Sequence, residues 1–166
     1  ASISKYYVLK GRDYLSDCLH CNPGVPASKA VPDDHLRPNQ LYALTLGAFR
    51  DHRRSMLILD ACSKLLIPGA IRSLADQKTD YALAIYSSSG VLLNDPVHPY
   101  WGRYEGDEDT RRKPAYHNGT AWTWQFPAYC EAYYMIYGKA GCRTARSLLS
   151  SCSLIMNDGC ISQLAE

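Results

Sequence analysis

The sequence has little of what marks a nucleic-acid-binding protein or a membrane protein. Its 18 basic and 16 acidic residues give a formal charge of only +2, and the basic residues form no tract beyond the pairs Arg53-Arg54 and Arg111-Arg112. So balanced a chain lacks the electrostatic footprint of nucleic-acid binding. It also lacks an apolar run of about 18 residues and a signal-peptide pattern. We therefore expect a cytoplasmic protein whose partner is neither a nucleic acid nor a membrane.

A complete set of disulfides is also excluded, because the number of cysteines, seven, is odd and several lie in helical patterns. Free thiols in a reducing compartment are the simpler interpretation, with Cys62, Cys130 and Cys142 as small core residues. Cys18 and Cys21 have the spacing of metal ligands but lack a second pair at a plausible distance. We predict no metal and no cofactor, and a small zinc or redox protein built on Cys18 and Cys21 is an alternative to exclude.

The length of 166 residues suits one domain, residues 1–166, that buries roughly 70% of its unfolded surface. Apolar periodicity predicts a mainly α-helical fold, with helices over residues 39–48, 51–66, 120–137 and 141–157. We expect Thr120 to cap the third helix and Pro127 to bend or interrupt it. That helix should end before Gly138.

Two segments fall outside this helical pattern. Residues 2–15 alternate weakly, which indicates a short strand or an extended arm. Residues 75–117 show little periodicity apart from a short piece at 81–86. A connection of about 40 residues is too long for a simple linker, and such loops are usually lids or binding loops.

Phenylalanine is scarce, with 2 Phe against 13 Tyr and 3 Trp, so most aromatic rings carry a polar group. Residues 115–124, AYHNGTAWTW, gather three such rings, a histidine, an amide and a glycine. A pocket for a neutral polyhydroxyl ligand needs these groups. His117 and Asn118 would then bond to sugar hydroxyls, and Trp122 or Trp124 would offer a stacking face. A helix start whose Trp residues pack into the core explains the same composition.

Two further segments add polar and aromatic groups. In residues 37–40, RPNQ, Arg37 is suited to hold a carboxylate and Asn39 to line a pocket; a capped helix start with a surface arginine is the plain alternative. Residues 100–107, YWGRYEGD, place Tyr104 and its aromatic and acidic neighbours between glycines. A turn-rich polar loop is one interpretation, but large aromatic rings have little reason to be exposed, and we favour a loop that lines a site.

Five segments of the chain follow the order of motifs in a known family. They are residues 37–44 (RPNQLYAL), 67–75 (IPGAIRSLA), 100–106 (YWGRYEG), 115–133 and 158–166 (DGCISQLAE). Together they resemble the C-terminal domain of glycogen debranching enzymes of the amylo-alpha-1,6-glucosidase type. That family has an RPNQ segment that opens a helix, a TP(Y/L)GLRSLSP-like turn, a Y-x-G-x-Y-x-G loop, an AYHQGTVWPWLLGPYIEAY segment and a final EGC-IGQISE-IFDG run. Asn118 stands in place of the family's Gln.

The resemblance implies an (α/α)₆ toroid, two concentric rings of helices with the site in a funnel of loops. It also implies hydrolysis of the α-1,6-linked glucose stub at a glycogen branch, with inversion, so a general acid and a general base act from opposite faces of the sugar. Glu166 would be the base, and the partner would be an α-glucan such as glycogen or limit dextrin. The candidate substrate-binding residues are Arg37, Asn39, Tyr104, Tyr116, His117, Asn118, Trp122 and Trp124.

The chain also departs from the family. The family's general-acid Asp lies upstream of RPNQ, in a segment that nothing in residues 1–36 resembles. Asp13 and Asp17 lie in this region, but the residues around them do not match that segment. Lys113 stands where the family often has Asp, residues 76–99 are longer than the usual spacing, and the IFDG run is missing. We expect a partial toroid, about four of twelve helices with long site-lining loops, whose unpartnered apolar faces favour self-association. A non-catalytic carbohydrate-binding or interaction module is the alternative function.

The missing acid predicts that the purified 166-residue chain releases no detectable glucose from a branched limit dextrin. Removing one member of an acid/base pair costs orders of magnitude in rate. A coupled glucose assay with a full-length debranching enzyme as positive control measures this. Robust turnover by the chain would contradict the prediction and place an acid within it, with Asp107 and Glu105 the first residues to mutate.

Overall fold

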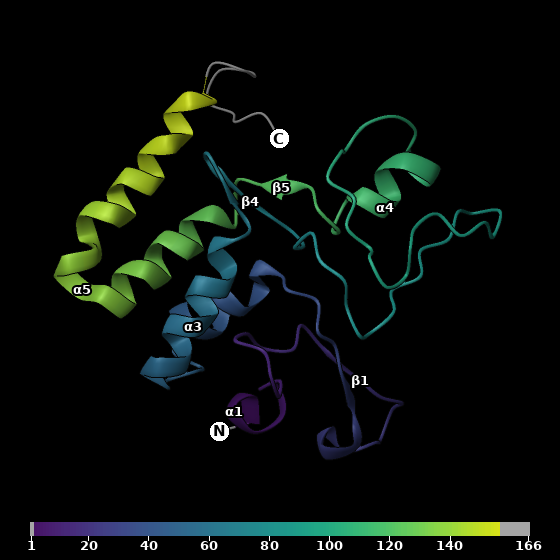
Figure 1. Cartoon of the computed structure of the whole chain (residues 1–166), viewed down its shortest axis with the longest axis horizontal. Helices are drawn as coiled ribbons and strands as arrows, with labels where there is room; N and C mark the ends of the chain where they lie inside the picture. Colours follow the sequence, from purple (N-terminus) through teal and green to yellow (C-terminus); the bar gives the residue numbers. More distant parts are fainter. Residues whose placement is uncertain (1, 157–166) are drawn as a thin grey trace.

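The computed structural model describes residues 2–156, shown in colour in Figure 1. Its helices are α1 (Ser2–Tyr6), α2 (Leu41–Thr45), α3 (His52–Ser63), α4 (Lys113–Ala115) and α5 (Phe126–Ser150). Its short strands are β1 (Leu19–His20), β2 (Val31–Pro32), β3 (Leu66–Ile67), β4 (Ala70–Arg72) and β5 (Ala121–Trp122). The fold is mainly helical, as the periodicity predicts. Among residues 2–156, no helix is both long enough and apolar enough to cross a membrane.

The core lies where α2, α3 and the first part of α5 pack together. The predicted helix over residues 51–66 is confirmed as α3, which begins after Asp51 because that side chain accepts a hydrogen bond from the Arg54 amide at 3.0 Å. Cys62 and Cys130 are buried in this core, as predicted, and burial raises the pKa of the Cys62 thiol. Cys142 is only half-buried. All six cysteines of the described part are free thiols.

The predicted helix over residues 39–48 is present but shorter. A 3₁₀ turn, Pro38–Gln40, leads directly into α2. Pro38 fits this first position, because its fixed φ is already helical and it has no amide hydrogen to leave unpaired. The helix stops at Thr45, and Gly47, with a φ of 67°, turns the chain away.

Helix α5 consists of two arms that meet at Gly138 (Figure 1). Gly138 has φ 56° and ψ −140°, a conformation that residues with a Cβ rarely adopt. The chain reverses direction there, so the first arm, which runs from β5 past α3, is followed by a second arm that runs back along the outside. The prediction that a helix ends before Gly138 and a further helix follows it is therefore confirmed.

The predicted start of this helix at Thr120 is wrong. Residues 121–122 form β5, in which Trp122 pairs with Ile71 of β4. Thr120 caps no helix, because its hydroxyl donates to the Ala115 carbonyl at 2.9 Å. Pro127 lies in the first turn of α5, where it neither bends nor interrupts the helix. The strand pairing, which is long-range, overrides the local helical periodicity.

The N-terminal prediction is also wrong. Residues 2–15 include α1 and only an isolated bridge between Val8 and Leu15, instead of a strand or arm. By contrast, residues 75–117 are largely irregular, as predicted, and run along one side of the molecule from β4 to α4 (Figure 1). One turn of π-helix, Glu108–Arg112, leads this segment into α4.

The hinge generates a stability prediction. We expect Gly138→Ala to lower the free energy of unfolding by about 1–3 kcal/mol, because a Cβ is strained at this φ and ψ. Lys139→Ala, at the exposed neighbouring position, is the matched control and should change stability by less than about 0.5 kcal/mol. Urea denaturation with an unchanged m-value measures both. Equal midpoints for the two variants would show that the hinge does not require glycine.

Candidate functional site

Arg37 joins four segments of the chain. It precedes the 3₁₀ turn in an extended conformation, φ −124° and ψ 157°, which points its side chain away from α2. One Nη donates to the carbonyls of Ser73, at 3.2 Å, and His117, and the other donates to Asn118 Oδ1 at 2.8 Å. The Nε pairs with Asp17 Oδ2 at 3.2 Å. Arg37 does hold a carboxylate, as the sequence predicts, but that carboxylate belongs to the chain.

Asp17 and Asn39 extend this network on the other side of Arg37. Asn39 donates to Asp17 Oδ1 at 3.0 Å and accepts from the Gln125 amide at 3.0 Å. Burial raises the pKa of Asp17, and the Arg37 charge and the Asn39 hydrogen bond oppose that shift. Asn39 therefore ties α2 to the start of α5. It lines a small pocket of about 260 Å³ beside Asp17, not the larger pocket described below.

The turn at residues 115–119 is held by backbone contacts. The buried Asn118 donates its side-chain amide to the Pro114 carbonyl at 2.9 Å, and its own carbonyl accepts from the Trp101 amide at 2.6 Å. Gly119 follows with a φ of 148°. A Cβ at Gly119 would lie 2.6 Å from the Trp101 carbonyl oxygen, so only glycine permits this approach. Gly119 also donates to Ser73 Oγ at 3.0 Å, which fixes the turn against β4.

Three aromatic rings cluster beside this turn. Tyr116 lies 5.1 Å from Trp122 and 5.6 Å from Tyr104, between ring centroids, in tilted or edge-to-face geometry. Trp122 is 8% exposed and donates its indole N–H to the Tyr116 carbonyl at 3.1 Å. Tyr104 and Tyr116 are 40% and 43% exposed, so their faces are open to solvent. Trp122 thus supports the cluster, and the two tyrosines present its surface.

These groups border an open pocket of about 1080 Å³. Its lining residues are Arg37, Leu83, Ile85, Tyr104, Glu108, Asp109, Arg112, Lys113, Tyr116, His117 and Asn118. The structure therefore brings five of the predicted residues to one pocket. Asn39, Trp122 and Trp124 do not line it, and Trp124 is 59% exposed elsewhere. A second pocket of about 680 Å³, between residues 8–15 and α3, contains none of the predicted residues.

About half of this lining is not predicted from the sequence. Leu83 and Ile85 lie in the short piece at residues 81–86 of the irregular segment, and Glu108, Asp109 and Arg112 lie in the π-helical turn. Nothing in the local sequence of either stretch signals a position at the pocket. The Arg112 guanidinium lies 5.9 Å from the Tyr104 ring centroid, within the range of a cation–π contact. Its Nε is buried without a hydrogen-bond partner in the described part of the chain.

The pocket offers neutral hydrogen-bonding groups between charged ones. Burial and the Arg37 charge both lower the pKa of His117, which favours its neutral form at physiological pH. A neutral imidazole both donates and accepts a hydrogen bond. The Asp109 carboxylate already accepts hydrogen bonds from Ser88, through the Ser88 amide at 2.8 Å and the Ser88 hydroxyl at 2.9 Å. These hydrogen bonds lower the pKa of Asp109.

Two of the other acidic candidates, Glu105 and Asp107, lie outside this pocket. Glu166, the predicted base, lies outside the described residues. Glu105 pairs with Arg103 at 3.1 Å on the surface, and Asp107 caps the π-helical turn by accepting from the Thr110 amide at 2.8 Å. Neither lines the pocket.

Comparison with known proteins gives a family match. The profile of the family described as amylo-alpha-1,6-glucosidase matches residues 2–166, which include the pocket, the Arg37 network and Glu166. No curated protein and no solved structure matches the chain.

The Arg37 network predicts a large loss of stability when the guanidinium is removed. We expect Arg37→Met to lower the free energy of unfolding by about 3 kcal/mol, because Asp17 is left largely buried without its ion-pair partner. Arg54→Met removes a half-exposed Arg–Asp pair, Arg54 with Asp51, and should cost less than about 1 kcal/mol. Urea denaturation compares the two variants. Equal losses would refute the central role of Arg37.

Proposed function

Because the chain belongs to the amylo-alpha-1,6-glucosidase family, we propose that the pocket beside Tyr116 and His117 binds a glucose unit of a branched α-glucan. The observation that supports this most directly is the convergence of distant parts of the chain on it. Arg37 lies far in the sequence from Tyr104 and from the turn at residues 116–118, yet all of them line the same pocket. Glycogen and its limit dextrins are the glucans that such a family processes.

The residues divide into those that contact sugar and those that position them. His117 donates to and accepts from hydroxyl groups, and the exposed faces of Tyr104 and Tyr116 pack against the apolar face of the glucose ring. The side chains of Arg37 and Asn118 form hydrogen bonds within the chain, so they hold the turn in place. Trp122 positions Tyr116 through its hydrogen bond to the Tyr116 carbonyl and the contact between the two rings. The proposal assigns Asn39 and Trp124 no contact with this glucose.

The proposed chemistry is hydrolysis of the α-1,6 bond with inversion. Glu166 is the proposed general base, on the strength of the resemblance of residues 158–166 to the family's motif. A base in this role takes a proton from a water molecule, which attacks the anomeric carbon from the face opposite the leaving oxygen. The general acid protonates that oxygen from roughly 6.5–9.5 Å away, a separation that leaves room for the water. We assign no residue of this chain to the acid.

The proposed architecture is a segment of an (α/α)₆ toroid. Its support is the packing of α2, α3 and α5 against one another, with the pocket lined by residues outside these three helices. Several large apolar side chains of α5 are exposed: Tyr134, Met135, Tyr137 and Leu149. In a complete toroid, neighbouring helices cover such a face. We propose that without them the chain self-associates through α5.

A binding experiment tests the proposed subsite. We expect the chain to bind isomaltose, which contains an α-1,6 linkage, and His117→Ala to weaken that binding at least about tenfold, or about 1.4 kcal/mol. The substitution leaves the turn intact, because Arg37 bonds to the His117 carbonyl and not to its ring. Isothermal titration calorimetry measures the affinities.

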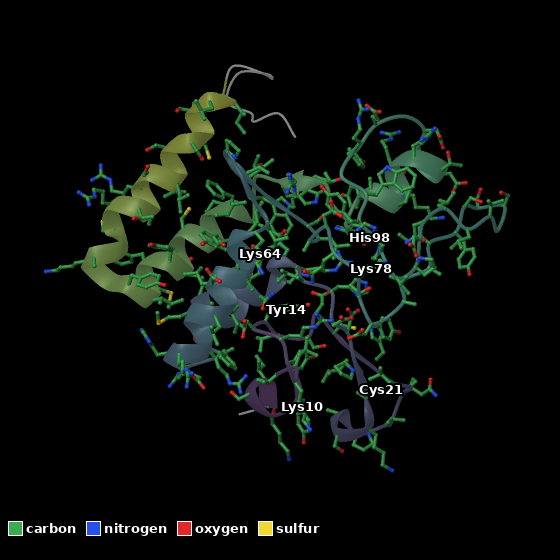
Figure 2. All side chains as sticks on the ribbon, in the orientation of Figure 1. Lys10, Tyr14, Cys21, Lys64, Lys78 and His98 are labelled. Carbon is green, nitrogen blue, oxygen red and sulfur yellow. The ribbon has the colours of Figure 1, made fainter. Side chains whose placement is uncertain are left out.

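His98→Ala is the matched control. His98 lies in the same irregular segment (Figure 2), pairs with Asp76 at 2.8 Å and does not line the pocket. We expect its affinity for isomaltose to equal that of the unmodified chain. Equal affinities for the unmodified chain and His117→Ala would remove His117 from the subsite, and absence of binding to the unmodified chain would contradict the proposed function.

A further inference from the structure

A second cluster of reactive side chains lies outside the pocket, on the hairpin formed by β1 and β2. These strands pair antiparallel, with Leu19 opposite Pro32 and His20 opposite Val31. The Asp33 amide then donates to the Cys18 carbonyl at 3.0 Å, which continues the pairing by one residue. Cys18 and His20 are two positions apart, so they face the same side of the strand. The hairpin thus gathers Cys18, His20 and Asp33.

The separations among these side chains fit a tetrahedral metal ion. Cys18 Sγ lies 3.4 Å from His20 Nε2, and His20 Nε2 lies 2.9 Å from Asp33 Oδ2. The ligand atoms of all three residues lie within 4.8 Å of one another. Tetrahedral zinc, with bonds of about 2.3 Å to sulfur and about 2.0 Å to nitrogen, separates those two atoms by about 3.5 Å. The sulfur also lies 3.7 Å from Nδ1, beside the ring, so the Cys18 side chain has to rotate for the sulfur and the Nε2 lone pair to share an ion.

The same three residue types occur in nucleophilic triads, but the geometry here differs. In a triad the imidazole uses one nitrogen for the nucleophile and the other for the carboxylate. In this hairpin His20 Nε2 is the nitrogen nearest to both Cys18 Sγ and Asp33 Oδ2, whereas Nδ1 is farther from the sulfur, at 3.7 Å. The sulfur lies almost equally far from the two nitrogens, beside the ring, so these contacts do not form the relay of a triad, whereas all three ligand atoms lie within 4.8 Å of one another.

Neighbouring groups orient these side chains. Asp33 Oδ1 accepts from the His35 amide at 2.9 Å and contacts the buried His35 ring, so Oδ2 is the oxygen directed at His20. The His20 ring stacks on Tyr81, with centroids 4.1 Å apart and an interplanar angle of 6°. Such supporting contacts fix ligand orientation in metal sites.

We propose that Cys18 Sγ, His20 Nε2 and Asp33 Oδ2 bind one Zn²⁺ ion. Thiolate, imidazole and carboxylate together are typical zinc ligands. On binding, the S–H bond of Cys18 breaks, a Zn–S bond forms, the proton passes to solvent, and nothing is oxidised or reduced. Cys18 and His20 are half-exposed, so water occupies the fourth position. No metal is expected from the sequence, because the Cys18–Cys21 pair has no second pair of ligands at a plausible distance; in the structure the third ligand is Asp33, 13 positions after His20.

Zinc binding by the purified, chelator-treated chain tests this proposal. We expect one zinc ion per chain after dialysis against ZnCl₂, measured by elemental analysis, and at least about tenfold weaker binding for Cys18→Ser and Asp33→Asn. Cys21→Ser is the matched control, because Cys21 is exposed beside β1 (Figure 2) and is not part of the cluster. We expect this control to bind zinc as the unmodified chain does.

A measurement on the unmodified chain covers the case in which a variant fails to fold. Zinc should slow the alkylation of Cys18 by iodoacetamide and leave the alkylation of Cys21 unchanged. Peptide mass spectrometry measures the extent of alkylation at each cysteine separately. Less than about 0.1 equivalent of bound zinc would overturn the proposal. So would a loss of binding in Cys21→Ser with retention in Cys18→Ser, or protection of Cys21 instead of Cys18.

Discussion

The candidate site depends on one buried cation. The Arg37 guanidinium is largely withdrawn from water, and burial lowers its pKa. Its donors are nevertheless satisfied by a carboxylate, two carbonyls and an amide from residues 17, 73, 117 and 118. A planar fork of donors suits this role, since a lysine ammonium does not reach several acceptors in fixed directions. Because these contacts come from three different parts of the chain, the position of the pocket wall follows from this one side chain.

The sequence predicts those parts of the fold that burial alone determines. The predicted helix at residues 51–66 and the end at Gly138 are confirmed, because a buried stripe or a glycine stop is a local signal. The prediction for residues 120–125 fails because β5 exists only through its pairing with β4, about 50 positions earlier. No local window contains both partners.

The residues of the candidate site are likewise predicted only in part from the sequence. Arg37, Tyr104, Tyr116, His117 and Asn118 reach one pocket, and their grouping rests on the resemblance to ordered motifs of a family. Leu83, Ile85 and Arg112 are missed because the segment that carries them is irregular, and its path depends on contacts such as that of Ser88 with Asp109. The sequence also does not distinguish residues that contact the ligand from residues that hold those residues in position. The amide of Asn118 and the indole ring of Trp122 are of types that suit sugar binding. In the structure, however, both side chains form hydrogen bonds with other residues of the chain.

The hinge at Gly138 affects how the molecule opens. It divides α5 into arms of about a dozen residues, and isolated helices of that length are marginal in water. The second arm has few buried residues, Gly141 and Ala145, whereas the first carries Phe126, Tyr129 and Ala132 into the core. Regions with little burial form the least stable cooperative units in native-state hydrogen exchange. We therefore expect the second arm to detach at a lower free energy than the first, and because it contributes no residue to the pocket, this local opening leaves the pocket assembled.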